Sequence, residues 1–95
     1  MSTATSIPGL TRSDGRYDFD LGGGEAAHAL TREEGNVVTV RHTEVPHHLR
    51  GSGNGAKLVT AVLDDIRARG MKVVPRCPFV ARFIRDNPAY ADLLA

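Results

Sequence analysis

The chain has 95 residues, with 12 lysines and arginines against 11 acidic residues, and its formal net charge at pH 7 is +1. This near-neutral balance gives no bulk electrostatic attraction to nucleic acid or to a membrane surface, so we expect neither as a partner. A single cysteine, Cys77, excludes an intramolecular disulfide and a thiolate zinc cluster, and we expect no metal site. One domain held together by packing alone is therefore predicted.

The first 15 residues are rich in Ser, Thr, Gly and Pro and show no apolar periodicity. They lack the apolar core of a secretion signal and the arginine-rich pattern of an organelle transit peptide. No stretch of the sequence approaches the roughly 18 apolar residues that a membrane helix needs. We therefore expect a flexible tail over residues 1–15, one domain over residues 16–95, and a cytoplasmic location.

Three strands are expected at the start of this domain. Residues 16–21 alternate apolar and polar side chains cleanly, as a half-buried strand does. Three glycines then form a turn, and residues 25–33 are expected as the second strand in spite of their three alanines. Residues 36–45, rich in valine, form the third strand. The short turns between these segments predict an antiparallel meander.

After Pro46 the pattern becomes helical, and apolar residues at helical spacing predict a helix over residues 53–69. Residues 71–75 are a short apolar run, expected as a fourth strand parallel to the third because the helix returns the chain to the sheet. A second helix is expected over residues 78–86. It is expected to bury Phe79, Val80, Phe83 and Ile84. The predicted class is α+β, with a small, mixed and mostly antiparallel sheet in the order β-β-β-α-β-α.

Three glycines at alternate positions, Gly51, Gly53 and Gly55, precede and open the first predicted helix. Glycine costs a helix interior roughly 1 kcal/mol relative to alanine, so the repetition needs a reason. A backbone without side chains lets an anion approach closely, and the free amides of a first helical turn point toward it. Arg50 and Lys57 add positive charge on either side. The turn therefore indicates a phosphate-binding site, and a flexible loop without a ligand is the alternative.

Two familiar phosphate-binding patterns fit this turn poorly. The P-loop pattern fails because Ala56 stands where its second glycine is required and Leu58 replaces its metal-binding hydroxyl. The dinucleotide fingerprint matches Gly51, Gly53 and Ala56, but a meander followed by one crossover lacks the repeated parallel units of that fold. Arg76 also stands where an acidic residue would follow the next strand. An NADP-binding fragment is kept as a remote alternative.

The stretch from Arg50 to Ala56 resembles the Q/R-x-x-G-x-G/A turn of the GNAT superfamily of N-acetyltransferases. The resemblance extends from residue 35 to the C-terminus and is greatest to the short, single-domain branch of these proteins. In that superfamily, the amides of the turn hold the pyrophosphate of acetyl-CoA. The resemblance therefore implies that the cofactor is bound by Arg50, Gly51, Ser52, Gly53, Asn54, Gly55 and Ala56. It also implies that Val45 offers backbone groups to the pantetheine arm, in a cleft where the third and fourth strands separate.

The activity implied is attack of an amine on the thioester of acetyl-CoA, which needs a neutral amine and a stabilised oxyanion. Glu44, near the end of the third strand, is the first candidate for the base. A surface carboxylate paired with Arg41 or Lys72 is the alternative for Glu44. His42 shares a strand face with Glu44, as a second base or as an ordinary sheet histidine.

Cys77 is expected at the start of the second helix, beside Arg76, where helix amides and a guanidinium group lower the pKa of a thiol. We therefore expect Cys77 to be alkylated faster than a free model thiol. Related proteins carry a cysteine here that faces the acetyl group, which makes Cys77 a candidate nucleophile, and a small buried apolar side chain is the alternative. Tyr90 resembles the tyrosine that protonates the leaving thiolate in some relatives, or else it closes the C-terminal turn as a buried aromatic.

The resemblance predicts an N-acetyltransferase of low activity that uses acetyl-CoA as its cosubstrate. A chain this short leaves the acceptor cleft open, which suits a large substrate such as a protein lysine, a site completed by a dimer, or a cofactor binder with little catalysis. A small amine is the other acceptor class. The alternatives are a module that binds CoA without turnover and the remote NADP-binding fragment. We expect a monomer or a weak dimer.

Overall fold

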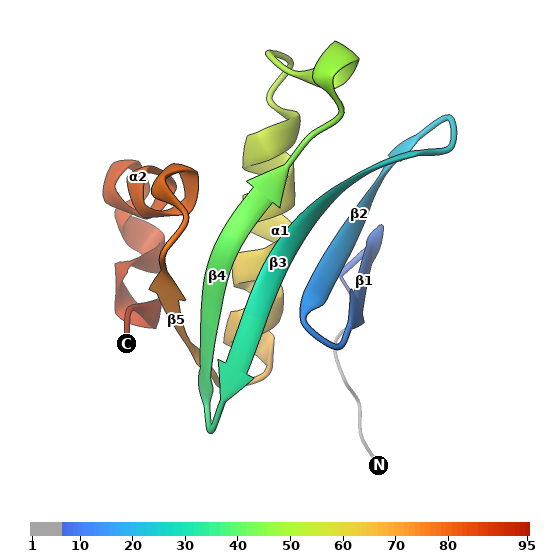
Figure 1. The fold of residues 1–95 in the computed structure, drawn as a ribbon. Helices are drawn as coiled ribbons and strands as arrows, with labels where there is room; N and C mark the ends of the chain where they lie inside the picture. Colours follow the sequence, from blue (N-terminus) through green and yellow to red (C-terminus); the bar gives the residue numbers. More distant parts are fainter. Residues whose placement is uncertain (1–6) are drawn as a thin grey trace.

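The computed structural model describes residues 7–95, which build one five-stranded sheet with helices on one of its faces (Figure 1). The strands lie side by side in sequence order, the first four antiparallel and the fifth parallel to the fourth. The strands are β1 (Leu10–Ser13), β2 (Arg16–Gly22), β3 (Glu25–Glu34), β4 (Val37–Glu44) and β5 (Lys72–Pro75). The predicted α+β class is confirmed. The predicted parallel pairing between the strand before the first helix and the strand after it is confirmed as well.

Two α-helices and two short 3-10 helices complete the fold. They are η1 (His47–Leu49), α1 (Asn54–Ala68), α2 (Pro78–Asp86) and η2 (Pro88–Leu93). In Figure 1, α1 crosses behind the sheet, and α2 lies beyond the β5 edge. Both predicted helices are confirmed to within about one residue at each end. No helix in residues 7–95 combines the length and the apolar character needed to cross a membrane.

Strand β1 corrects the expectation of a flexible tail over residues 1–15. Leu10 lies opposite Phe19 and Ser13 lies opposite Arg16, so this segment is part of the sheet, and the sheet has five strands where four were expected. The strand escaped prediction because it lies at the sheet edge and Leu10 is its single apolar side chain. Residues 1–6 of the expected tail lie outside the described residues.

The core lies between the sheet and α1. On the sheet, Ala27 and Ala29 of β3 and Val38 and Val40 of β4 are almost wholly buried. They pack against an apolar stripe of α1 formed by Leu58, Val59, Val62, Leu63 and Ile66. The alanines, which are poor strand formers, are explained by this contact, because small side chains let the helix lie close to the sheet.

A β-bulge in β4 decides which side chains reach the functional site. Val40 lies opposite Thr31, but the next pair joins His42 to Leu30, so Arg41 is an extra residue on β4. Side chains therefore change faces at this point. Val40 faces α1 before the bulge, and Thr43 lies on that same face after the bulge. Both residues line a small space under α1. His42 and Glu44 consequently share the face that carries no helix.

Candidate functional site

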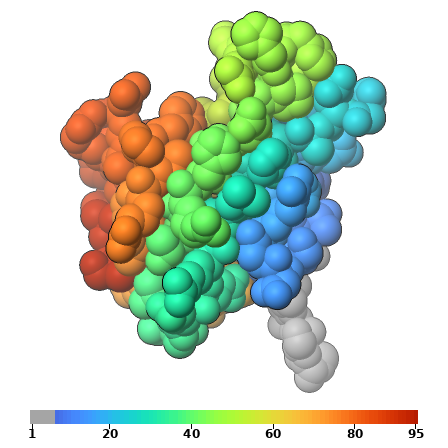
Figure 2. Space-filling view, in the orientation of Figure 1, coloured from blue at the N-terminus to red at the C-terminus, as the bar shows by residue number. Residues whose placement is uncertain are grey.

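A cleft opens where β4 and β5 separate. The last residues paired between these strands are Val40 and Pro75. Beyond them β4 continues to Glu44, whereas the chain after β5 turns away into α2. The cleft has a volume of about 550 Å³, and Figure 2 shows a notch between α2 and the loop that follows β4. It is lined by Thr43, Glu44, Val45, Arg50, Gly51, Gly53, Gly55, Ala56 and Phe79.

The glycine-rich turn forms one wall of this cleft and leads into α1. Gly51 and Gly53 have φ of +84° and +80°, and a Cβ on either would meet nothing within 4 Å. Their backbone conformation, not crowding, therefore requires glycine. Gly53 is the N-cap of α1 and contributes no capping side chain, which leaves amides of the first helical turn free to meet an anion. Ser52 lies outside the cleft lining, and so does Asn54, whose side chain donates a hydrogen bond to the carbonyl of Leu49 (3.0 Å).

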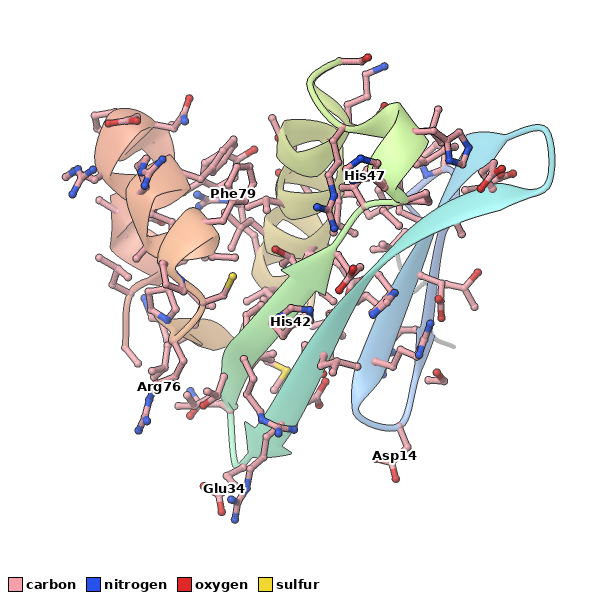
Figure 3. The ribbon with its side chains drawn as sticks, turned by 45° about the horizontal axis from the view of Figure 1, so that its top comes forward. Asp14, Glu34, His42, His47, Arg76 and Phe79 are labelled. Carbon is pink, nitrogen blue, oxygen red and sulfur yellow. The ribbon has the colours of Figure 1, made fainter. Side chains whose placement is uncertain are left out.

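Gly55 has a different reason to be glycine. It lies inside α1 with ordinary helical φ, and a Cβ there would stand 3.0 Å from Cζ and 3.3 Å from Cε2 of Phe79. Figure 3 shows Phe79 between α2 and α1. Phe79 is 41% exposed, so the expectation that α2 buries it is wrong. Val80 and Ile84 are buried as expected. The sequence pattern gave no sign that Phe79 lines the cleft, because its exposure depends on how α2 docks.

Arg50 ties the loop after β4 back to the end of that strand. Its Nε donates to the carbonyl oxygen of Val45 (3.0 Å), and its Nη2 donates to the carboxylate of Glu44 (3.2 Å). On the other side of the loop, Nε2 of His48 lies 3.1 Å from Oε2 of Glu25. These contacts hold the loop that carries the glycine turn against β3 and β4.

Glu44 and His42 form a pair at the cleft. Nε2 of His42 lies 2.8 Å from Oε1 of Glu44 on the helix-free face of the sheet, which confirms that they share a face. The hydrogen bond from His42 lowers the pKa of Glu44, and the charge of Arg50 adds to this effect against some desolvation. The expected partners Arg41 and Lys72 were wrong. Arg41 is the bulged residue, and Lys72 donates to a backbone carbonyl near the C-terminus.

A second histidine lies beside this pair. His28 of β3 is directly opposite Glu44, and its ring centre is 6.4 Å from that of His42. Within residues 7–95, no three His, Cys, Asp or Glu side chains gather as a metal ion would require.

Cys77 is the N-cap of α2 and lies behind the cleft wall. It is 5% exposed, and its Sγ is 3.5 Å from Oγ1 of Thr43, which does line the cleft. Burial raises the pKa of this thiol, but the nearby Thr43 and the backbone N–H groups at the start of α2 outweigh burial and bring the pKa below its ordinary value. Contrary to expectation, Arg76 is not among the main causes of this lowered pKa, and its side chain points outward (Figure 3). Burial also limits the access that fast alkylation would need.

Tyr90 is not brought to the cleft. Its hydroxyl donates to Oδ1 of Asp64 on α1 (2.9 Å), and its ring packs against Phe83. Asp64 lies ten residues after Asn54, which is about 15 Å along the helix. The structure therefore shows Tyr90 as an aromatic that closes the C-terminal segment onto α1.

A protein-family model described as GCN5-related N-acetyl-transferase matches residues 16–93. The chain belongs to this family. Among curated proteins it is similar to Protein NATD1 of Bos taurus and of Homo sapiens, each 33% identical over 52 residues, which is 55% of this chain and 46% of each relative. The chain thus spans about half the length of the curated relatives that it matches.

Among solved structures, a GCN5-like protein of Staphylococcus aureus determined by NMR superposes with a TM-score of 0.70. It is 24% identical, and the match covers 96% of this chain and 91% of that one, so it supports the fold. Membership in the family supports acetyl transfer as the general class of reaction. In residues 7–95 the sheet has one parallel pair, β4 with β5, and thus lacks the repeated parallel unit that the remote NADP-binding alternative requires.

Proposed function

We propose that this GNAT-family protein transfers the acetyl group of acetyl-CoA to an amine, with the cofactor in the cleft between β4 and α2. One observation carries the proposal: the cleft leads directly onto the N-terminus of α1, which no side chain caps because the N-cap residue is Gly53. The pyrophosphate of the cofactor lies there, because free amides and the positive end of the helix dipole favour an anion. Gly51 and Gly53 let it approach the backbone closely.

The pantetheine arm follows the free edge of β4. Beyond Val40 this strand pairs with β3 alone, so the edge that faces the cleft has backbone groups without a strand partner. The amide-containing arm pairs with such an edge as a short strand does. Thr43, Glu44 and Val45 all line the cleft, as this arrangement requires.

The chemistry is direct attack by the amine nitrogen on the thioester carbonyl. The new C–N bond forms, the C–S bond breaks, and CoA leaves as a thiolate that takes up a proton. We assign the proton lost by the amine to the pair of Glu44 and His42, in which the carboxylate is ionised at neutral pH and orients the imidazole. An imidazole is the stronger base of the two, so His42 is the final acceptor. The acceptor substrate is an amine that reaches the helix-free face, from a protein lysine or a small molecule.

A CoA-binding module without turnover is the second candidate. It is favoured by the ties of Glu44 to His42 and Arg50, which lower its pKa and weaken it as a base. Acetyl transfer that is lost on replacing Glu44 or His42, with acetyl-CoA binding retained, separates the two functions in favour of the enzyme.

The binding claim is tested by Gly53→Asp. The new carboxylate blocks the approach to the backbone amides and repels the pyrophosphate, so we expect the affinity for acetyl-CoA to fall by about 100-fold or more. Arg50→Ala should cost less, because the backbone donors remain. Isothermal titration calorimetry measures both, and affinity should also weaken with added salt.

Gly70→Asp is the matched control for Gly53→Asp. Gly70 has φ of +69° with open space around it at the other end of α1, so it suffers a similar backbone strain and gains the same charge. This control should bind acetyl-CoA as the parent does, and thermal melts report the folding of both variants. A folded Gly53→Asp protein with the affinity of the parent would show that the pyrophosphate is held elsewhere.

A further inference from the structure

Phe79 is an aromatic residue that α2 presents to the cleft instead of to the core. It lies in the first turn of α2 and lines the cleft opposite the end of β4. Among residues 7–95, Phe79 and Leu94 are the large apolar residues that are exposed, at 41% and 44%. An exposed aromatic inside a cleft is a packing surface that lacks its partner.

Gly55 is shaped to this ring. Gly55 is the second residue of α1 and its φ is not in the left-handed region, so its backbone conformation gives no reason for glycine here. The nearest atoms to a Cβ at this position are Cζ and Cε2 of Phe79, at 3.0 and 3.3 Å. Gly55 therefore makes room for the far end of the ring, whereas Gly51 and Gly53 serve the backbone of the turn.

We propose that Phe79, packed against Gly55, binds the apolar pantetheine arm of a CoA thioester. Gly55 lacks a side chain because the ring needs the space, while its backbone amide remains one of the free amides of the first turn of α1. This inference rests on the proposed function. The arm carries methylene groups and a dimethyl-substituted carbon, which pack on an aromatic ring and on Val45 across the cleft. The two ends of the cofactor are thus bound by different residues. The glycine-rich turn binds the nucleotide, and Phe79 binds the pantetheine arm.

The test divides the cofactor into its two halves. Parent, Phe79→Ala and the control Leu94→Ala are titrated with acetyl-CoA, with acetyl-pantetheine and with 3′-phospho-ADP. Loss of the ring should lower the affinity for acetyl-CoA and for acetyl-pantetheine by about tenfold. The affinity for 3′-phospho-ADP should stay within about twofold of that of the parent. Leu94→Ala removes an equally exposed apolar side chain outside the cleft lining and should change none of the three affinities.

A double-mutant cycle tests the role of Gly55. The added methyl of Gly55→Ala meets the movable end of the half-exposed Phe79 side chain, so the protein should still fold. The displaced ring should lower the affinity for acetyl-CoA several-fold. In the Phe79→Ala background the same change should have no further effect. Thermal melts of each variant show that folding is retained.

Three results would overturn the inference. They are an unchanged affinity of Phe79→Ala for acetyl-CoA, an equal loss for 3′-phospho-ADP, and a loss from Gly55→Ala that persists without Phe79. A parent protein that binds none of the three ligands would instead overturn the proposed function, and the inference with it. The parent titration therefore distinguishes the two failures.

Discussion

At the scale of single residues, Cys77 shows how burial and hydrogen bonding act on one thiol in opposite directions. The amides at the start of α2 and the hydroxyl of Thr43 favour the thiolate. Its 5% exposure, however, keeps Cys77 outside the cleft lining, and Thr43 stands between the two. A thiol in this position suits a structural N-cap region better than attack on a thioester in the cleft.

We therefore expect Cys77→Ala to retain acetyl transfer, with turnover within about threefold of the parent, because direct attack by the amine needs no thiol. Turnover is followed as CoA released from acetyl-CoA in the presence of lysine-containing peptides and small primary amines. Cys77→Ser, which keeps the size of the side chain, is the control for packing. Loss of turnover in both variants, with melting temperature and acetyl-CoA affinity retained, would establish a covalent route through Cys77.

The glycine turn could be predicted from the sequence because its signal is local. Strand end, glycines and helix start follow one another within a few residues, and the structure places Gly51 and Gly53 in the left-handed conformation at the cleft. The role of Phe79 could not be predicted in this way. Its exposure and its contact with Gly55 arise from the docking of α2 against α1, which no spacing in the sequence reports.

At the scale of elements, α1 is fixed at its C-terminal end by a partly buried polar cluster. The hydroxyl of Tyr17, a fully buried residue of β2, donates to Oδ2 of Asp65 at 2.6 Å. Arg69 donates to the same carboxylate oxygen (3.1 Å) and to Glu33 of β3 (2.7 Å). Burial and the hydrogen bond to Asp65 hold the pKa of Tyr17 well above its usual range, so the phenol stays protonated as a donor. This cluster sets the position of α1 and hence of the turn at its other end.

Tyr17→Phe should lower the free energy of unfolding by about 1–3 kcal/mol, because a buried carboxylate loses a donor and cannot recover it from water. Tyr90→Phe is the matched control, since it removes a hydroxyl whose partner Asp64 lies nearer the surface, and it should cost about 1 kcal/mol or less. Urea unfolding of the two variants measures both. Equal effects, or no effect of Tyr17→Phe, would contradict the importance assigned to this cluster.

The elements themselves could largely be predicted from hydrophobic periodicity. The alternation of residues 16–21 and the helical spacing of residues 53–69 correspond to β2 and α1. Strand β1 was missed because pairing along an edge leaves little apolar pattern in the sequence. The bulge at Arg41 was missed as well, because an extra residue in a strand is defined by its partner and not by its own side chain.

At the scale of the whole molecule, the ends of three elements meet at one rim of the sheet. The free end of β4, the start of α1 and the start of α2 converge there, and each contributes to the cleft lining. Among residues 7–95 the helices occupy one face of the sheet (Figure 1). His42 and Glu44 lie on the other face. Under the proposed function, the cofactor and the acceptor therefore approach the thioester from different sides. The proposed function requires acetyl-CoA to occupy this rim.

The most direct test is a titration of the ¹⁵N-labelled protein with acetyl-CoA, followed residue by residue in two-dimensional NMR spectra. We expect saturable shifts of the backbone amides of residues 43–45, residues 50–56 and Phe79, because these residues line or flank the cleft. The amides of β1 should stay within the noise, since this strand lies at the opposite edge of the sheet. No shifts at saturating acetyl-CoA, or shifts confined to residues outside this rim, would contradict the proposed position of the cofactor.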